Sequence, residues 1–205
     1  MQQSGQIFVI TAPSGTGKTT LIRAVRDKVS AIGYCVSHTT RKPRSGELNG
    51  THYHFVTRKE FEQMIDAHRF VEWAHVYGHL YGTSYSSMES ELSSGEDLLL
   101  DLDIQGAEAI KRHFPESLSI FVLPPSMEVL EQRLRGRATD KGKDVDLRMK
   151  KAAKEIRRCG KYDFIVVNDD LVQTVREIGA IILCQRARSW RRYPLIKDLF
   201  HLRGA

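Results

Sequence analysis

Residues 12–20 read APSGTGKTT, and the apolar run IFVI at residues 7–10 comes directly before them. Gly15 and Gly17 permit a tight turn whose backbone N–H groups converge on one point, which is how a polypeptide cradles phosphate. A helix beginning at about Gly17 would also direct its positive dipole end toward that phosphate. The usual pattern has Gly where this chain has Ala12. The stretch predicts a phosphate-binding loop between a buried strand and a helix.

Charged and hydroxyl side chains complete this predicted site. Lys18 adds a positive charge for the β- and γ-phosphates of a nucleotide, and Thr19 places a hydroxyl where it can ligate Mg²⁺. The run LLLD at residues 98–101 is typical of a central parallel strand, and its terminal Asp101 can hold the same ion through water. Helix capping is the alternative role for Asp101. Asp103 points to the same side of an extended segment, which favours a role at the metal or at a ligand hydroxyl.

Strand-like and helix-like segments alternate along the chain, which predicts an α/β fold with a parallel sheet flanked by helices. The predicted strands cover residues 6–11, 34–37, 98–101, 119–123 and 164–167, with further strand-like patterns at 51–57 and 70–77. The predicted helices cover residues 17–31, 58–68, 86–94, 104–113, 126–135, 145–159 and 171–184. Residues 38–50 are predicted to form a loop. Because ligands bind beyond the carboxyl ends of such strands, the loop at 12–18, Asp101 and Asn168 should converge.

The composition of the 205-residue chain is ordinary, with 41% hydrophobic and 27% charged residues. No apolar run approaches membrane-spanning length and the first five residues lack a signal pattern, so we expect a cytoplasmic protein without a membrane partner. The three cysteines, Cys35, Cys159 and Cys184, lack metal-binding spacing and are expected to be reduced. The net charge of +6 suits a protein that binds two anionic nucleotides and does not require a nucleic-acid partner.

A second concentration of basic residues lies at 37–47, which read SHTTRKPRSGE. Arg41 and Arg44 are three residues apart, so two guanidiniums can grip one phosphate by forked hydrogen bonds. Tyr53 and Tyr81 could each add a hydroxyl. Taken alone, an arginine pair in a loop is more often solvated surface. Beside a phosphate-binding loop it suggests phosphoryl transfer between two nucleotides, which needs positioning and neutralisation of charge.

Residues 133–140 read RLRGRATD and supply cations to a predicted lid. Arg133 and Arg137 would be neighbours on one helix, and Arg148 follows on the next. A closing lid would bring these side chains to the transferring phosphoryl group and expel water, which limits wasteful hydrolysis. A solvated basic helix is the alternative.

Seven stretches, in this order and spacing, give the chain a resemblance to guanylate kinases over residues 5–185. They are PSGTGK (13–18), SHTTRKPR (37–44), EWA (72–74), YGT (81–83), DLDIQG (101–106), PPS (124–126) and VNDD (167–170). The resemblance implies Mg²⁺-dependent transfer of the ATP γ-phosphoryl group to GMP, giving ADP and GDP. It also implies a P-loop NTPase-type core (1–37, 87–125 and 161–205), a GMP-binding α+β insertion (38–86) and a helical lid (126–160).

The resemblance further implies roles for individual residues. Catalysis is assigned to Lys18, Arg41, Arg133, Arg137 and Arg148. ATP binding is assigned to Ser14, Gly15, Thr16, Gly17, Lys18, Thr19, Thr20 and Asn168. GMP binding is assigned to Ser37, Arg41, Arg44, Tyr53, Glu72, Tyr81, Thr83 and Asp103. Thr19 and, through water, Asp101 are assigned to the metal.

One of these residues gives guanine selectivity a physical basis. The Glu72 carboxylate can accept hydrogen bonds from guanine N1–H and the exocyclic N2–H₂ together, while hydroxyls at Ser37 and Thr83 can donate to O6. Adenine lacks that pair of donors, so an unpaired carboxylate would penalise AMP.

Two other functions are alternatives. One is a guanylate-kinase-like module that has lost catalysis and binds a peptide in the GMP cleft, but such modules typically lose the loop lysine or glycines. The other is a P-loop kinase with a different acceptor, such as a phosphorylated sugar. Residues 186–205 extend beyond the stretch that resembles guanylate kinases. We expect this basic tail to pack Trp190 and Tyr193 on the domain or on another subunit of a homo-oligomer, and RNA contact is its alternative role.

Overall fold

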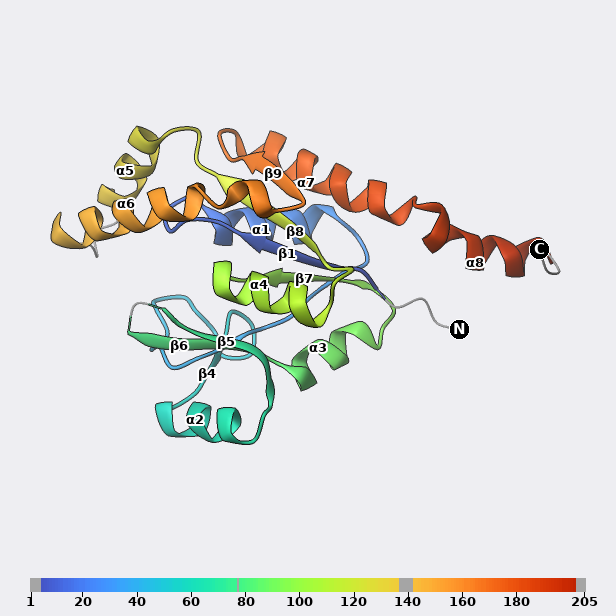
Figure 1. Ribbon diagram of the computed structural model, residues 1–205, viewed down its shortest axis with the longest axis horizontal. Coiled ribbons are helices and arrows are strands. Elements are labelled where there is room, and N and C mark those ends of the chain that lie inside the picture. The colour runs from blue at the N-terminus through green and yellow to red at the C-terminus, as the bar shows by residue number, and fades with distance from the viewer. Residues whose placement is uncertain (1–4, 77, 137–141, 202–205) are drawn as a thin grey trace.

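The computed structural model describes residues 5–76, 78–136 and 142–201. Its centre is a five-stranded sheet in the order β2-β7-β1-β8-β9, and every pairing in this sheet is parallel (Figure 1). The strands are β1 (Ile7–Thr11), β2 (Ile32–Tyr34), β7 (Asp97–Asp101), β8 (Leu118–Leu123) and β9 (Phe164–Val167). All five residues of β1 are buried, which is why its sequence is a continuous apolar run. The predicted α/β class is confirmed.

Helices cover both faces of this sheet. On one face α1 (Lys18–Lys28) and α7 (Leu171–Arg186) pack over Phe8 and Ile10 of β1. On the other face α3 (Tyr85–Leu92) and α4 (Ile104–His113) pack over Ile7 and Val9. Each fully buried side chain of this kind contributes about 1.5–3 kcal/mol. The two apolar layers therefore fix the strand that leads into the phosphate-binding loop.

A second, four-stranded sheet with the order β4-β3-β6-β5 lies beside the core (Figure 1). Its strands are β3 (His38–Thr39), β4 (His54–Phe55), β5 (Phe70–Val76) and β6 (His79–Ser84). The helix α2 (Arg58–Asp66) begins at a capping box formed by Thr57 and Glu60. It covers the sheet with Phe61, which packs against Phe70 and Leu80.

The structure corrects the prediction of several elements. The second strand is Ile32–Tyr34 rather than 34–37, because its register with β7 pairs Gly33 with Leu98. Residues 38–50 are not all loop, since β3 lies within them. The segment His79–Ser84 was not predicted as a strand, yet it is the antiparallel partner of both β5 and β3. Pairing with strands distant in sequence determines both short elements, and local pattern does not carry that information.

Two helices lie together at one end of the molecule in Figure 1, α5 (Met127–Arg135) and α6 (Gly142–Ile156). They pack through Leu130 and Leu134 of α5 and Val145 and Ala152 of α6. The side chain of Ser126 caps α5 by accepting a hydrogen bond from Val129 N at 3.2 Å. A short 3₁₀ turn, η1 (Cys159–Lys161), precedes β9.

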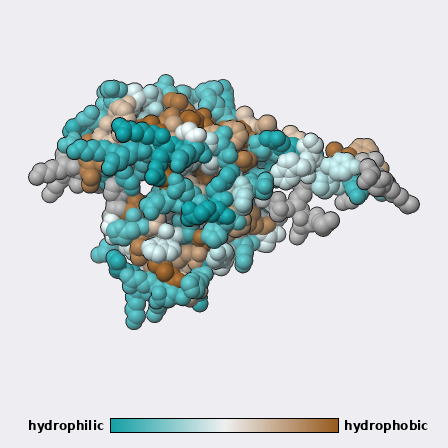
Figure 2. Space-filling model, viewed as in Figure 1, coloured by the Kyte–Doolittle hydropathy of each residue, from teal (hydrophilic) through white to brown (hydrophobic). Residues whose placement is uncertain are grey.

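The C-terminal tail forms a helix, α8 (Ser189–Leu199), which projects from the body of the molecule (Figures 1 and 2). Asp97 at the start of β7 anchors it, because this buried carboxylate lies 2.7 Å from both Arg186 Nε and Arg191 Nη2. With Arg191 directed inward, Trp190 and Tyr193 are 61% and 48% exposed. Packing of these rings on the domain, one of the two expected arrangements, is therefore wrong, and contact with another subunit stays a prediction.

Candidate active site

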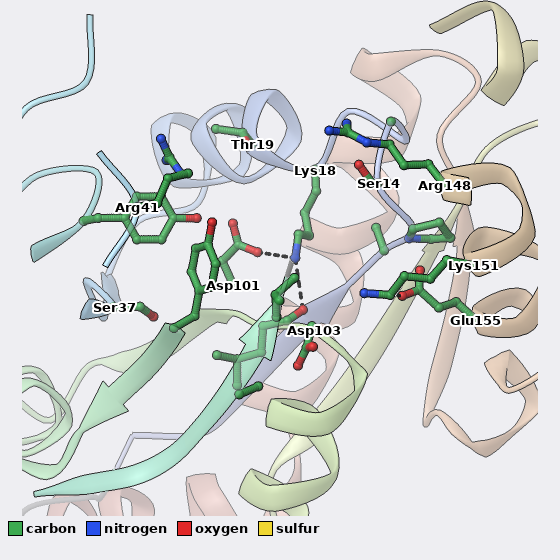
Figure 3. A pocket seen from close by; sticks show the side chains of 18 of the residues that line it. Ser14, Lys18, Thr19, Ser37, Arg41, Asp101, Asp103, Arg148, Lys151 and Glu155 are labelled. Atoms are coloured by element: carbon green, nitrogen blue, oxygen red, sulfur yellow. Dashed lines mark hydrogen bonds and ion pairs between the residues drawn. The ribbon is translucent and has the colours of Figure 1, made fainter. Parts of the chain in front are cut away.

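A cavity of about 240 Å³ opens where the phosphate-binding loop, the smaller sheet and α6 meet. In the close view, Ser37 and Arg41 lie on one side of Lys18 and Asp101, while Arg148, Lys151 and Glu155 lie on the other (Figure 3). The cavity is lined by most of the site residues predicted from the sequence, namely Ser14, Gly15, Gly17, Lys18, Thr19, Ser37, Arg41, Arg44, Tyr53, Glu72, Tyr81, Asp101, Asp103 and Arg148. The fold thus brings two sets of anion-binding groups to one space.

The phosphate-binding loop has the geometry that its glycines predict. Gly15 and Gly17 have φ of +98° and +95°, backbone conformations that residues with a Cβ rarely adopt. Gly17 is the N-cap of α1. A Cβ on Gly15 would also lie 2.8 Å from Leu134 of α5. The predicted start of α1 at about Gly17 is therefore correct, and the N-terminus of this helix faces the cavity.

Two residues assigned to ATP binding or catalysis, Arg133 and Asn168, hold the phosphate-binding loop through its backbone. The carbonyl of Thr16 accepts hydrogen bonds from Asn168 Nδ2 at 2.7 Å and from Arg133 Nη1 at 3.2 Å. The same Arg133 nitrogen donates to the carbonyl of Asn168. These contacts connect α5, the end of β9 and the loop. Arg133 and Asn168 are therefore placed to fix the loop, and their direct contact with nucleotide stays a prediction.

Lys18 lies at the centre of the cavity. Its ammonium is 2.5 Å from Asp101 Oδ1 and donates to the carbonyl of Leu102 at 3.0 Å (Figure 3). The strand β7 ends at Asp101, so the pairing of β7 with β1 brings lysine and carboxylate together. Asp101 does not cap α4. That role belongs to Asp103, whose Oδ1 accepts from Gly106 N at 2.9 Å while the residue also lines the cavity.

Glu72 lies at the far wall of the cavity and is only 7% exposed. Its Oε1 accepts a hydrogen bond from Thr83 Oγ1 at 2.6 Å, and the Thr83 and Ser37 hydroxyls are 3.3 Å apart. Gly106 leaves room for this carboxylate, because a Cβ there would approach Glu72 Oε2 to 2.8 Å. Burial raises the pKa of Glu72 to about 7. The hydrogen bond from Thr83 lowers this pKa, and the nearby charge of Asp103 raises it further.

Two aromatic rings lie against the guanidinium of Arg41. Its guanidinium carbon lies 5.4 Å from the centre of the Tyr53 ring and 5.7 Å from that of Phe55. The Tyr53 and Tyr81 rings meet edge to face at 5.9 Å. Both tyrosines and Arg44 line the same cavity, so the predicted cradle for the acceptor phosphate is assembled in one place.

Sequence reasoning missed two charged residues of the cavity, Lys151 and Glu155 on α6. Together with Arg148 they are spaced three and four residues apart, which places all three on one helix face. Lys151 Nζ lies 3.7 Å from Glu155 Oε1. Burial raises the pKa of Glu155, although the charge of Lys151 opposes the rise. That helical spacing is the signal that could have identified them.

Some predicted residues lie elsewhere. Thr20 lines a second cavity of about 670 Å³ beside α1, and Thr16 is buried inside the loop. Thr83 contributes through its hydrogen bonds to Glu72 and Ser37. Arg137 falls outside the described residues.

Comparison with known proteins agrees with this arrangement. The family model described as guanylate kinase matches residues 4–184. The chain belongs to the guanylate kinase family. It is 42% identical over 202 residues to a guanylate kinase of Geobacter sulfurreducens, an alignment that covers 98% of this chain and 100% of that protein. It is 48% identical over 187 residues to a guanylate kinase of Shewanella violacea, covering 91% and 90% of the two chains.

A solved structure extends the similarity to three dimensions. The crystal structure of guanylate kinase from Anaplasma phagocytophilum matches with a TM-score of 0.77 and 31% identity, over 99% of each chain. The family model ends before α8, whereas the Geobacter relative aligns along nearly the whole chain.

The described residues also bear on membrane association and metal binding. None of the helices described is long and apolar enough to cross a membrane. Within the same described residues, no group of three or more His, Cys, Asp or Glu side chains could hold a metal ion. Thr19 and Asp101, the two residues assigned to Mg²⁺, both line the cavity.

Proposed function

We propose that the protein transfers the γ-phosphoryl group of ATP to GMP, giving ADP and GDP. The observation that carries this proposal is the placement of a buried carboxylate, Glu72, with two hydroxyls at one wall of the cavity, and of the Lys18 loop at another. The first group suits a guanine base and the second suits a triphosphate. Membership in the guanylate kinase family supports the same reaction.

One group of residues would recognise the guanine base of GMP, and another would bind its phosphate. The Glu72 carboxylate accepts from guanine N1–H and N2–H₂, and the Ser37 hydroxyl can donate to O6. Thr83 Oγ1 donates to Glu72 Oε1 in the unliganded site, so it would turn its hydrogen to O6 when guanine takes its place on the carboxylate. A base without that donor pair leaves the buried carboxylate unpaired, which costs about 1–3 kcal/mol or more for a charged group. Arg41 and Arg44 bind the phosphate with forked, charge-assisted hydrogen bonds.

Catalysis would rest on positioning and charge. Lys18 reaches the β- and γ-phosphates from the loop, while Arg148 and Lys151 approach from α6 on the opposite side of the cavity (Figure 3). These cations neutralise the charge that spreads over the transferring phosphoryl group. Movement of α6 toward the loop would exclude water and so favour GMP over hydrolysis.

Thr19 and Asp101 fit a site for Mg²⁺, which supplies charge neutralisation at the β- and γ-phosphates when bound. A hydroxyl and one carboxylate suit this ion because Mg²⁺ keeps several waters and is held by few protein ligands. Asp101 now contacts the Lys18 ammonium. When Lys18 turns to the phosphates, the carboxylate becomes available to the metal.

We also propose that the protein works in the cytoplasm and that two copies of it pair. The three cysteines are free, as expected in the reducing cytoplasm. Trp190, Tyr193 and Leu199 of α8 are exposed, so pairing of two copies of the chain, if it occurs, would bury apolar side chains of this helix. Sedimentation of the protein and of Trp190→Ser tests that pairing: a dimer that the substitution dissociates supports it, and a monomeric parent refutes it.

The direct test is ADP formation from Mg-ATP with GMP, AMP, UMP, CMP, a phosphorylated sugar or no acceptor, measured in parallel. We expect turnover with GMP alone. Absence of turnover with every acceptor, in protein shown to be folded by circular dichroism, would favour a binding module. Turnover with a phosphorylated sugar and not with GMP would favour a different kinase.

A further inference from the structure

The carboxylate of Glu47 forms a two-point contact with Arg41. Arg41 Nη1 donates to Glu47 Oε2 and Arg41 Nη2 donates to Glu47 Oε1, each at 2.9 Å. Glu47 Oε2 also accepts from the backbone N–H of Arg44 at 2.7 Å. A single carboxylate therefore connects both arginines of the cradle. The two side chains are 12% and 18% exposed, so water screens the pair only partly.

Glu47 reaches Arg41 from outside the acceptor's cavity. Arg41, Arg44 and Tyr53 line both the candidate active-site cavity and the second cavity beside α1, whereas Glu47 lines only the second. The guanidinium of Arg41 thus stands in the wall between two spaces. Glu47 contacts it from one space, and the acceptor phosphate would approach it from the other.

The hydrogen bonds of Arg41 indicate which edge of its guanidinium is available to bind the phosphate. Nη1 also donates to the carbonyl of Lys42 at 2.8 Å. These contacts use both hydrogens of Nη1 and one of Nη2. The two that meet Glu47 lie at the end of the fork, and the one that meets Lys42 lies on the side of Nη1 that faces Cδ. An oxyanion can also bind at two points to the other edge of the guanidinium, which carries Nε–H and the second Nη2 hydrogen.

Charge supports the same interpretation. Burial alone lowers the pKa of Arg41, but the hydrogen bond to Glu47, the nearby Tyr81 and the charge of Glu47 outweigh it, so the net pKa is raised. Burial raises the pKa of Glu47, and the hydrogen bonds from Arg41 and Arg44 outweigh it, so the net pKa is lowered. Both groups are therefore charged at neutral pH, and the contact persists under assay conditions.

We propose that Glu47 is a positioning residue for the acceptor phosphate, which holds the end of the Arg41 fork so that the Nε edge faces the cavity. This inference rests on the proposed function. Loss of the carboxylate would let the guanidinium rotate and would release the backbone of Arg44. The effect belongs to binding of the acceptor, so it should appear in the KM for GMP and not in the KM for ATP.

The test compares Glu47→Gln, Glu47→Asp and a matched control, Glu62→Gln. Glu62 is a carboxylate of the same subdomain that pairs with Arg58 at the surface, far less buried than the Glu47 pair. We expect Glu47→Gln to raise the KM for GMP about tenfold, because an amide nitrogen then faces the guanidinium. The KM for ATP and the kcat at saturating GMP should stay within about twofold. Glu47→Asp should recover part of the loss, and Glu62→Gln should match the parent.

A double variant separates positioning from a general effect on the fold. If Glu47 acts through Arg41, adding Glu47→Gln to Arg41→Gln should raise the KM for GMP by less than about twofold. A further tenfold rise would overturn the proposal, as would an unchanged or lowered KM for GMP in Glu47→Gln alone. A lowered KM would mean that Glu47 competes with the phosphate. If the parent and Glu62→Gln fail to turn over GMP, the proposed function itself fails.

Discussion

Glu72 should make the protein less stable as the pH rises, because its burial opposes ionisation. The pKa of this carboxyl is about 7 in the folded protein, against an ordinary value of 4.5. Between these two values the folded state binds more protons than the unfolded state, so the free energy of unfolding falls as the pH increases. Each pH unit corresponds to about 1.4 kcal/mol. Ionisation of Glu72 therefore costs the native state about 3 kcal/mol by pH 8.

Replacement of this residue by glutamine removes the cost and keeps the shape. In Glu72→Gln the amide oxygen can still accept the hydrogen bond from Thr83 Oγ1. We expect the difference in unfolding free energy between the variant and the parent to shift by about 3 kcal/mol in favour of the variant between pH 4.5 and pH 8. Urea unfolding of both proteins at several pH values measures it, and the contributions of other titrating groups cancel in the difference.

The same substitution should harm function while it helps stability. For the parent, kcat/KM with GMP should rise with pH through about 7, since only the ionised carboxylate accepts from both guanine donors. Glu72→Gln should lose that pH dependence and most of the preference for GMP over AMP, with the KM for ATP unchanged. A stability difference that does not vary with pH would refute the reasoning about burial. An unchanged preference for GMP would refute the assignment of Glu72 to guanine.

Three further substitutions test other parts of the structure. Lys18→Ala should lower kcat about 100-fold or more, and near-normal turnover would refute the proposed role of the loop. Gly15→Ala should lower stability by about 1–3 kcal/mol, because it places a side chain at positive φ against Leu134, and thermal unfolding would detect it. Asp97→Asn should cost about 3–5 kcal/mol by leaving Arg186 and Arg191 without a buried carboxylate, and a loss below about 1 kcal/mol in urea would contradict this.

The parts of the fold that follow from local sequence were predicted well. The phosphate-binding loop, the central strands and α4 could be assigned because apolar runs, glycines and caps mark them within a few residues. The strand His79–Ser84 could not, because its polar sequence is held by antiparallel pairing with β5 and β3. Non-local pairing of this kind leaves little trace in a short segment.

In the candidate site too, residues in local motifs could be predicted, and residues placed by tertiary packing could not. Residues in compact motifs, such as Lys18 and Arg41, were identified because each motif has a chemical reason for its spacing. Lys151 was missed because its predicted helix is basic throughout, and only packing shows which cation faces the cavity. The outward direction of Trp190 was equally hidden, because it depends on the ion pair between Arg191 and Asp97.

The packing of α5 has a mechanical consequence. Leu134 closes over Gly15, Arg133 donates to the carbonyl of Thr16, and Leu130 packs with α6. The helix therefore contacts both the loop that would hold the nucleotide's phosphates and the helix that carries Arg148 and Lys151. A small displacement of that loop would be transmitted through α5 to Arg148 and Lys151 on α6. Binding of phosphates at the loop would in this way change the position of the cations that neutralise the transferring phosphoryl group.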